Sequence, residues 1–225
     1  MWLVALLCVQ AAGAATFADL RAARDRQDRP GLEKLITDFS AAAEKNGKDA
    51  RAQYELAVAN SYLAEISLET RQRNEARSAA EAGIRAAEKA VALKPGMAEY
   101  HRILGTLCGQ VIPANVMAGL RYGRCALDNV NKAVELDPKS SDAYLSRGVG
   151  YYYLPAAFGG GTDLAIKDME RAIELNPKSA DAWMWLGVAQ RKKNQFAEAR
   201  KSLMKSLELN GNRVWAKQLL EKTPK

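Results

Sequence analysis

The stretch DAWMWLGVAQRKKNQFAEARKSLMKSLELNG, residues 181–211, decides the fold of this chain. Good helix formers dominate it, as they dominate the whole sequence, and no run of alternating β-branched and polar residues indicates a strand. Small and large residues stand at fixed places in its two halves, and the set is Trp183, Leu186, Gly187, Ala199, Leu203 and Ser206. Small residues let two helices approach closely and large ones fill the space between them, so the stretch predicts a packed pair of helices.

The end of this stretch recurs three times earlier in the chain. The motifs AVALKP, AVELDP, AIELNP and SLELNG end at Pro95, Pro138, Pro177 and Gly211, with spacings of 43, 39 and 34 residues. A proline cannot continue a helix, so it separates one pair from the next. Because stacked pairs can bury the apolar face that one pair leaves open, the repetition predicts an all-α, helix-turn-helix repeat array.

This pattern resembles the tetratricopeptide repeat (TPR), a helix-turn-helix unit of 34 residues. The last repeat carries W-x2-L-G at Trp183, Leu186 and Gly187, whereas Gln190 stands where the family has Tyr and Gly211 replaces the closing proline. The two preceding repeats match the same places with His101, Leu104, Gly105, Cys108, Ala126, Val130 and Ala133, and with Tyr144, Gly148, Tyr151, Ala165, Met169 and Ala172. The resemblance covers roughly residues 51–222 and implies a TPR-like α-solenoid with a concave side.

The repeats and their flanks divide the chain into three parts. Residues 1–15 are expected to be a signal peptide, 16–48 an N-terminal helical cap that breaks at Arg29-Pro30-Gly31, and 49–225 the repeat array. The repeats are expected at about 49–95, 96–138, 139–177 and 178–211, with a C-terminal capping helix over 212–225. The second and third of them have enlarged intra-repeat turns, with nine and five inserted residues.

The first fifteen residues, MWLVALLCVQAAGAA, are uncharged, mostly apolar and too short to span a bilayer. Ala12-Gly13-Ala14 fits the small-residue rule for cleavage, which predicts an exported protein, periplasmic if the source is Gram-negative. The signal peptide lacks a basic n-region, which a start codon placed too far downstream would explain. A buried N-terminal helix is the alternative interpretation, and no later segment is apolar enough to cross a membrane.

Cleavage of such a leader would leave two cysteines, Cys108 and Cys125. An even number in an oxidising compartment permits one disulfide, and two buried free thiols are the alternative. The two cysteines fall on the facing helices of one repeat, so we hypothesise a disulfide that closes the GQVIPANVMAGLRYGR insertion.

The net charge of +7 lies entirely in the last 35 residues, which hold ten basic and three acidic side chains. This basic end could attract an acidic protein or anionic head groups, or serve as a polar cap on the last face of the array. No tight cluster of Lys and Arg with interleaved aromatic residues occurs, so nucleic acid is not an expected partner.

The sequence offers little that indicates catalysis. Its one histidine, His101, stands where the repeat normally has Trp or Tyr, which favours a packing role over a catalytic one. One His and two separated Cys do not make a metal site, and no cofactor motif occurs, because the three glycines at 159–161 follow a helix and a nucleotide-binding glycine loop follows a strand. We therefore expect no metal, no cofactor and no enzymatic activity.

The resemblance implies a binding surface on the concave side, where the first helix of each repeat meets ligands. Its expected partner-binding residues are Tyr62, Arg102, Gln110, Tyr152, Tyr153, Met184, Arg191 and Lys192. Tyrosines give a large contact area with a polar tip. The alternative for the YYY run at 151–153 is packing against the inserted turns.

The stretch LPAAFGGGTD, residues 154–163, is interpreted as an enlarged turn inside a repeat rather than a phosphate site, because no basic residue precedes Lys167. Glycine supplies positive φ after a helix, and Thr162 or Asp163 is expected to cap the next one. We expect this turn and its counterpart one repeat earlier to shape the mouth of the site, through Pro113, Pro155, Gly159, Gly160 and Gly161.

Two functions remain open from the sequence. The first is an exported scaffold that binds a protein or peptide partner in its concave surface. The second is a periplasmic carrier of a small apolar ligand, or an accessory component of a solute transporter, since the chain is similar in outline to the T component of TRAP-type solute transporters. The partner, the pathway and the oligomeric state do not follow from the sequence.

Overall fold

The computed structural model describes residues 15–114 and 116–225, and this part of the chain folds into eleven α-helices and two short 3-10 helices. The helices are α1 (Phe17–Asp25), α2 (Arg29–Lys45), α3 (Ala50–Glu69), α4 (Arg73–Leu93), α5 (Ala98–Val111), η1 (Ile112–Ala114), α6 (Val116–Leu136), α7 (Ser141–Tyr153), η2 (Ala156–Phe158), α8 (Thr162–Leu175), α9 (Ala180–Lys192), α10 (Phe196–Leu209) and α11 (Val214–Glu221). The predicted all-α class is confirmed.

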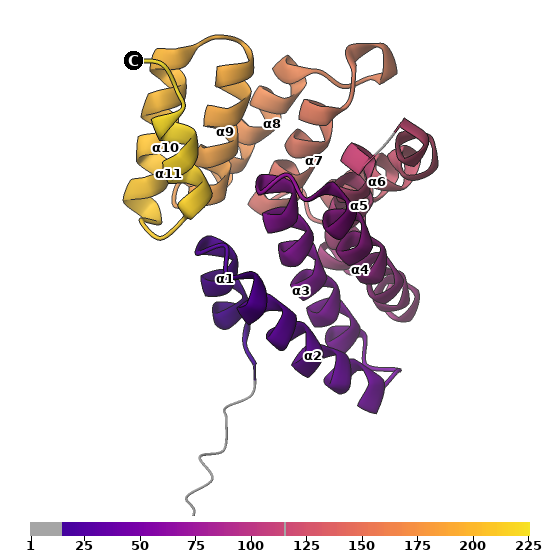
Figure 1. The fold of residues 1–225 in the computed structure, drawn as a ribbon. Coiled ribbons are helices and arrows are strands. Elements are labelled where there is room, and N and C mark those ends of the chain that lie inside the picture. The colour runs from indigo at the N-terminus through magenta and orange to yellow at the C-terminus, as the bar shows by residue number, and fades with distance from the viewer. Residues whose placement is uncertain (1–14, 115) are drawn as a thin grey trace, which may run out of the picture.

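Four helix pairs, α3/α4, α5/α6, α7/α8 and α9/α10, stack in chain order into a curved array (Figure 1). The two members of each pair pack closely, and each pair also contacts the next one. Helices α1 and α2 cover the first pair, and α11 packs on the last. The TPR-like α-solenoid predicted from the repeated motifs is therefore the observed architecture.

Small residues place the paired helices where the sequence predicts. A Cβ atom built on Gly187 of α9 would lie 2.8 Å from the Leu203 side chain of α10, so only glycine fits this crossing without a shift.

Equivalent serines begin the first helices of the last two pairs: Ser140 Oγ accepts a hydrogen bond from Ala143 N (3.1 Å), and Ser179 Oγ accepts one from Ala182 N (3.3 Å). These serines satisfy backbone donors that a helix start leaves open.

The N-terminal cap breaks at residues 26–28, just before the predicted break at Arg29-Pro30-Gly31, and these three residues belong to α2. Helix α1 ends at Asp25 and α2 begins at Arg29, so Pro30 lies in the first turn of α2, where its missing N–H costs nothing. Gln27 between them takes a left-handed conformation, with φ of 53°. The expected leader lies outside the described residues, apart from Ala15. Over residues 15–114 and 116–225 we find no helix with the length and apolarity needed to span a bilayer.

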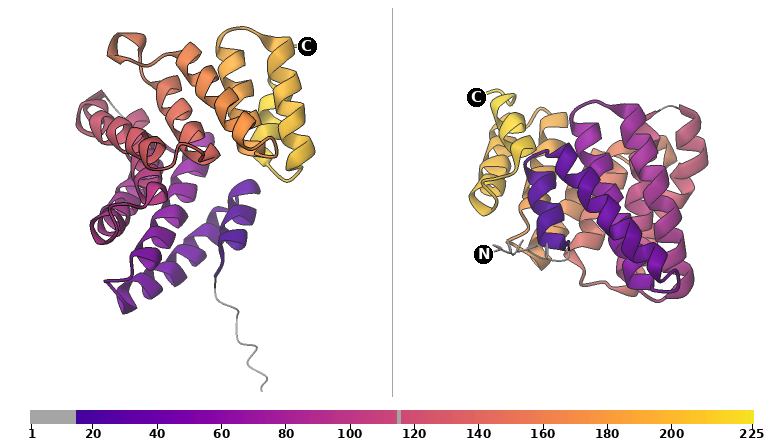
Figure 2. Two further views of the ribbon diagram at one scale, coloured as in Figure 1. Left: turned by 180° about the vertical axis from the view of Figure 1, so that it is seen from behind. Right: turned by 60° about the horizontal axis from the view of Figure 1, so that its bottom comes forward.

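The two ends of the array meet. Both views of Figure 2 place α1 beside the C-terminal helices α10 and α11. Two side-chain hydrogen bonds join these elements directly: Asn210 Nδ2 donates to Asp25 Oδ2 (2.7 Å), and Gln218 Nε2 donates to Gln27 Oε1 (3.4 Å). The curvature accumulated over four pairs thus brings the N-terminal cap against the C-terminal end, and the array closes on itself.

Candidate functional site: the inner face

The first helices of the four pairs form the inner side of the curve. Helix α3 packs against α5, α5 against α7, and α7 against α9, in addition to the contacts within pairs. We call the surface formed by α3, α5, α7 and α9 the inner face. All eight residues expected to bind a partner come from these helices, but the structure places them in four different surroundings.

Three of the eight, Tyr152, Tyr153 and Lys192, lie together at one end of α7 and α9. The tyrosine ring centroids are 5.0 Å apart and the rings are nearly perpendicular. Lys192 Nζ donates to Tyr152 O (2.8 Å) and lies 4.3 Å from the centroid of the Tyr152 ring. This group agrees with the expectation that the tyrosines and the basic end of α9 share one surface.

Two tryptophans that the sequence interpretation did not select complete an aromatic cluster, defined as Tyr152, Tyr153, Trp185 and Trp215. The Trp185 ring lies 6.0 Å from Tyr152, 6.2 Å from Tyr153 and 5.3 Å from Trp215, in edge-to-face arrangements. Aromatic pairs favour this geometry. Trp185 lies two residues beyond the repeat-signature tryptophan, so its helical position could have indicated the inner face, whereas Trp215 arrives from α11 and carries no repeat signal.

Tyr153 is the exposed member of the aromatic cluster. About half of the residue, 49%, is open to solvent. Burial by the surrounding protein nevertheless raises the pKa of its phenol well above the usual range, and the Tyr152 phenol and the Glu69 and Glu65 carboxylates raise it further. Tyr153 thus combines a half-exposed ring with a phenol group that interacts with the Glu65 and Glu69 carboxylates.

Other expected residues are engaged inside the protein. Met184 has no exposed surface and packs in the hydrophobic core with Leu203 and Leu219, so its expected contact with a partner is wrong for this structure. Gln110 Nε2 donates to Ser61 O (3.1 Å), and Arg191 Nη2 donates to Lys222 O (3.4 Å). Ser61 of α3 thus satisfies both polar atoms of the Gln110 amide, because Ser61 Oγ also donates to Gln110 Oε1 (3.1 Å).

Arg102 lies in the middle of the inner face within a polar strip. Its guanidinium donates to Glu99 Oε1 (2.8 Å) and to Ser146 Oγ (3.3 Å), which links α5 to α7. Burial alone would lower the pKa of Arg102, but the Glu99 carboxylate offsets this and holds the pKa above its usual range. Arg102 is therefore a permanent cation on the inner face, paired with one carboxylate and partly accessible.

The remaining residue, Tyr62, belongs to an unpredicted network where the chain ends meet. The Arg24 guanidinium of α1 lies 4.9 Å from the centroid of the Tyr62 ring. We define the terminal ion cluster as the six charged residues around this contact, namely Arg24, Asp25, Glu65, Glu69, Asp181 and Arg213. They come from α1, α3, α9 and the turn before α11.

Arg24 and Arg213 are the two cations that organise the terminal ion cluster. Arg24 Nη1 lies 2.9 Å from Asp181 Oδ2, and Arg24 Nη2 lies 2.7 Å from Asp25 Oδ1. Arg213 Nη2 lies 2.7 Å from Glu65 Oε1 and also contacts the Glu69 carboxylate. The Arg213 side chain is only 1% exposed, so the expectation that the C-terminal basic residues form a solvated end is wrong for Arg213.

Four carboxylates face two guanidinium groups in the terminal ion cluster, so negative charge is in excess. Burial raises the pKa of Glu69 to about 7, with the nearby Glu65 carboxylate acting in the same direction while Arg213 and Gln27 oppose it. The Glu69 side chain is only 3% exposed, which explains why desolvation dominates. This carboxyl therefore titrates near neutral pH.

We expect the free energy of unfolding to fall as pH rises through the Glu69 titration. The folded-state pKa of about 7 lies above the ordinary value of 4.5, so the folded chain binds more protons between these pH values. The loss from this group is on the order of 1 kcal/mol between pH 6 and pH 8. Urea unfolding at both pH values measures it.

The matched variant for this titration is Glu69→Gln, which keeps a polar side chain beside Arg213 and cannot ionise. Its free energy of unfolding should lack the Glu69 contribution, so the difference in stability between wild type and variant should change by roughly 1 kcal/mol over the same interval. A difference that is independent of pH would contradict the assigned titration. Other groups facing Glu69, namely Glu65, Arg213 and the Tyr153 phenol, remain in both proteins.

The disulfide hypothesis is confirmed in the structure. Cys108 of α5 and Cys125 of α6 are bonded, with their Cα atoms 6.0 Å apart. The bond joins the two helices on either side of the first enlarged turn, which contains Pro113. Thus a covalent link fixes the base of that turn, as the facing positions of the two cysteines predicted.

The second enlarged turn carries Pro155 and the three glycines between α7 and α8. Gly159 and Gly161 have φ values of 83° and 124°, which favour glycine. Gly161 is the N-cap of α8 and Thr162 is its first residue, so the expectation that Thr162 or Asp163 caps this helix is wrong. The turn follows Tyr152 and Tyr153 directly, whereas its role in shaping the mouth of a site stays a prediction.

His101 has the packing role that its repeat position indicates. Its Nε2 lies 2.8 Å from Pro95 O, and in the last repeat Trp183 Nε1 donates to Pro177 O (3.0 Å) from the same place. Across residues 15–114 and 116–225, no group of three or more His, Cys, Asp or Glu side chains has an arrangement that could hold a metal ion.

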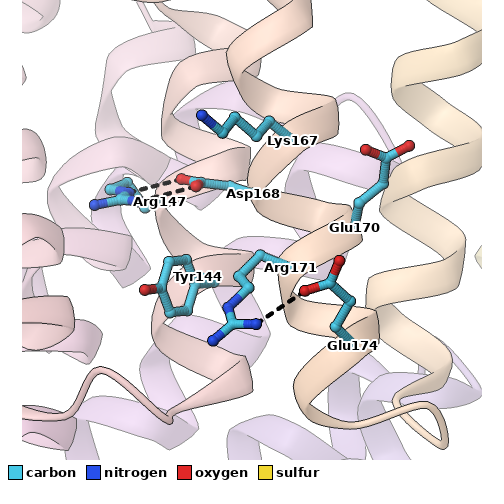
Figure 3. Close-up of a pocket in the computed structure, with 7 residues that line it drawn as sticks. All are labelled: Tyr144, Arg147, Lys167, Asp168, Glu170, Arg171 and Glu174. Carbon is cyan, nitrogen blue, oxygen red and sulfur yellow. Dashed lines mark hydrogen bonds and ion pairs between the residues drawn. The ribbon is translucent and has the colours of Figure 1, made fainter.

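A depression of about 340 Å³ lies on α7 and α8 (Figure 3). Its lining residues are Tyr144, Arg147, Lys167, Asp168, Glu170, Arg171 and Glu174. Arg147 Nε donates to Asp168 Oδ2 (2.6 Å), and Arg171 Nη1 donates to Glu174 Oε2 (2.9 Å). Because these charges satisfy one another, the depression offers a ligand less than the aromatic cluster does.

Comparisons with known proteins agree with this architecture. A tetratricopeptide repeat family model matches residues 156–211, and no curated protein sequence matches the chain. Among solved structures, TTC0263, a thermophilic TPR protein from Thermus thermophilus, superposes with a TM-score of 0.64 at 20% identity, covering 91% of this chain and 98% of that one. The HusA haemophore from Porphyromonas gingivalis superposes with a TM-score of 0.60 at 20% identity, covering 80% of this chain and 96% of that one. The family match places a tetratricopeptide repeat at residues 156–211, and the solved structures share the fold of the longer helix-pair array.

Proposed function

We propose that this chain is an exported, non-catalytic scaffold that binds a protein or peptide segment on the inner face, beside the aromatic cluster. The tetratricopeptide repeat is generally a scaffold for protein interactions, and the fold by itself does not specify a partner. The observation that carries the proposal is the half-exposed Tyr153, held in place by Tyr152 and Trp185 on a surface that is otherwise well packed.

The chemistry of the inner face suits a peptide. A rigid aromatic side chain supplies contact area at low entropic cost, and the polar strip with Arg102 and Glu99 supplies hydrogen-bonding groups further along α5 and α7. The part of the inner face beside α1 is closed, because Arg24 lies over Tyr62 and contacts Asp181. We therefore place the peptide along α5 and α7, with an apolar side chain against Tyr153.

Export is supported by chemistry and stays a proposal. Disulfides such as Cys108–Cys125 persist mainly in oxidising compartments. Together with the apolar leader at residues 1–15, this favours an extracytoplasmic location, periplasmic in a Gram-negative cell.

A carrier of a small apolar ligand is the second candidate, favoured by the haemophore among the solved structures of the same fold. At 20% identity that likeness concerns the fold alone. The depression on α7 and α8 argues against an apolar ligand there, since all of its lining side chains except Tyr144 are charged. A small molecule that stays bound through purification, seen by native mass spectrometry, would favour the carrier.

We expect a peptide selected from a random display library on the immobilised protein to depend on Tyr153. Replacement by alanine removes the exposed ring and should weaken binding at least tenfold, since aromatic anchors typically contribute more than about 1.4 kcal/mol. Fluorescence polarisation with the labelled peptide measures the dissociation constants.

The matched control is Tyr144→Ala, which removes a tyrosine from the same helix α7 at the depression in Figure 3. It should leave the peptide affinity unchanged. Equal affinities for wild type and Tyr153→Ala, with circular dichroism showing intact helices, would refute the proposed site.

A further inference from the structure

The turn between α7 and α8 presents a phenylalanine to solvent on an ordered scaffold. Phe158 N donates to Pro155 O (2.9 Å), Gly160 N donates to the same oxygen (3.2 Å), and Gly161 N donates to Tyr151 O (2.9 Å). A Cβ atom on Gly160 would lie 2.2 Å from Leu154 O, so the turn is closely packed on the end of α7. Yet Phe158 is 73% exposed.

A second apolar side chain is displayed at the preceding enlarged turn. Met117, at the start of α6, is 70% exposed, and these two are the most exposed large apolar residues of the described chain. Figure 1 shows that the turns within the α5/α6, α7/α8 and α9/α10 pairs follow one edge of the array, at the top of the view. We call residues 117–124, 153–167 and 190–201 the turn edge.

The turn edge is also the basic side of the molecule. It contains eight Lys and Arg residues against two acidic ones, whereas the turns between pairs on the opposite edge, residues 93–99, 135–142 and 174–181, contain three basic and six acidic residues. Six of its bases are exposed, namely Arg121, Arg124, Lys167, Lys192, Lys193 and Lys201. Basic residues therefore gather on the turn edge and acidic residues on the opposite edge, an asymmetry that the net charge of +7 does not reveal.

The shape of the turn edge decides between kinds of partner. A peptide needs a groove or a sheet edge in which to bury its side chains, and Phe158 and Met117 instead project from turns. A bilayer surface accepts projecting apolar side chains into its interface, while anionic head groups attract the surrounding bases. The combination of projecting apolar tips and positive charge thus favours a lipid surface.

We propose that the turn edge docks on an anionic lipid bilayer, with Phe158 and Met117 entering the interface and the neighbouring Lys and Arg residues contacting lipid phosphates. The residues that carry this interaction, Phe158, Met117, Lys167 and Lys201, are separate from the proposed peptide site, although Tyr153 and Lys192 lie where the turn edge meets the inner face. The protein could then hold a peptide partner while it rests on a membrane.

Co-sedimentation with vesicles tests the proposal. Vesicles of phosphatidylcholine with phosphatidylglycerol should bind the protein, and vesicles of phosphatidylcholine alone should bind it much less. Phe158→Ala should lower the partition coefficient at least fivefold, and Lys167→Ala with Lys201→Ala should lower it by about fivefold for each lysine. Added salt should release the protein, because it screens the lysines from the phosphates.

Matched controls come from outside the turn edge. Met204→Ala removes an exposed apolar side chain from α10, and Lys94→Ala with Lys139→Ala removes two bases from the opposite edge. Both should bind like the wild type. The same variants are also made in a chain that begins at Ala15 and so keeps all the described helices. This chain shows whether the apolar leader, residues 1–14, contributes to vesicle binding.

Several outcomes would overturn the proposal. They are equal binding to both kinds of vesicle, an unchanged partition coefficient for Phe158→Ala, equal losses for the control variants, or binding that vanishes when residues 1–14 are removed. If Phe158→Ala instead weakens binding to an acidic protein while vesicle binding is unaffected, the edge serves protein contact. Peptide affinity at Tyr153 is measured separately, so the two proposals fail independently.

Discussion

Replacing Arg213 by methionine should lower the free energy of unfolding by about 3–5 kcal/mol. The Arg213 guanidinium contacts Glu65 and Glu69 and is almost completely buried, so its removal leaves two carboxylates with no nearby cation except Arg24. An uncompensated buried charge is far more costly than the loss of one exposed ion pair. Urea unfolding followed by circular dichroism measures the loss.

Lys217→Met provides the matched control for Arg213, because Lys217 is an exposed residue of the same C-terminal segment. It should change the free energy of unfolding by less than about 0.5 kcal/mol. Adding Glu69→Gln to Arg213→Met should restore part of the stability, because it removes one of the carboxylates left unpaired. A loss below about 1 kcal/mol for Arg213→Met would contradict the role given to the terminal ion cluster.

Reduction of the Cys108–Cys125 disulfide should cost about 3 kcal/mol of unfolding free energy. The bond closes a loop with a sequence separation of 17 residues, and the cross-link restricts the unfolded chain more than the folded one. Urea unfolding with and without a reducing agent gives the difference.

A double variant, Cys108→Ala with Cys125→Ala, separates the bond from the reagent. Its stability should not respond to the reducing agent, whereas that of the wild type should. Reaction of both Cys108 and Cys125 with a maleimide in the unreduced, unfolded protein, located by mass spectrometry, would show that the bond is absent and would contradict the prediction.

The helix pairs could be predicted because the signal for each pair is local. Gly187 and Leu203 lie 16 positions apart, and their sizes alone indicate a close crossing, which the structure contains. The facing positions of Cys108 and Cys125 likewise follow from one repeat. Packing within a pair depends on residues that are near in sequence, so the pattern of residue types is enough to infer it.

The closure of the array could not be predicted in the same way. Arg24 and Asp181 are 157 residues apart, and each looks like an ordinary surface charge on its own helix. Their contact depends on the curvature accumulated over four pairs, which no single repeat encodes. For the same reason Arg213 was grouped with the solvated basic end, and Met184 with the residues open to a partner.

The candidate site was predicted in part. Tyr152, Tyr153 and Lys192 are brought together, and they owe this to their positions at the ends of α7 and α9. Trp215 was missed because it comes from α11, beyond the last repeat, where no repeat position applies. A binding surface formed jointly by a repeat and the C-terminal helix can therefore be recognised only once the three-dimensional structure is known.

The most direct measurement of the central claim is site-specific photo-crosslinking to the selected peptide. Benzoylphenylalanine is placed at Tyr153 in one protein and at Met204, an exposed position on α10, in another. The account predicts a crosslinked product, located by mass spectrometry, for the first protein and none for the second. Equal crosslinking at both positions, or crosslinking at Met204 alone, would contradict a peptide site on the inner face.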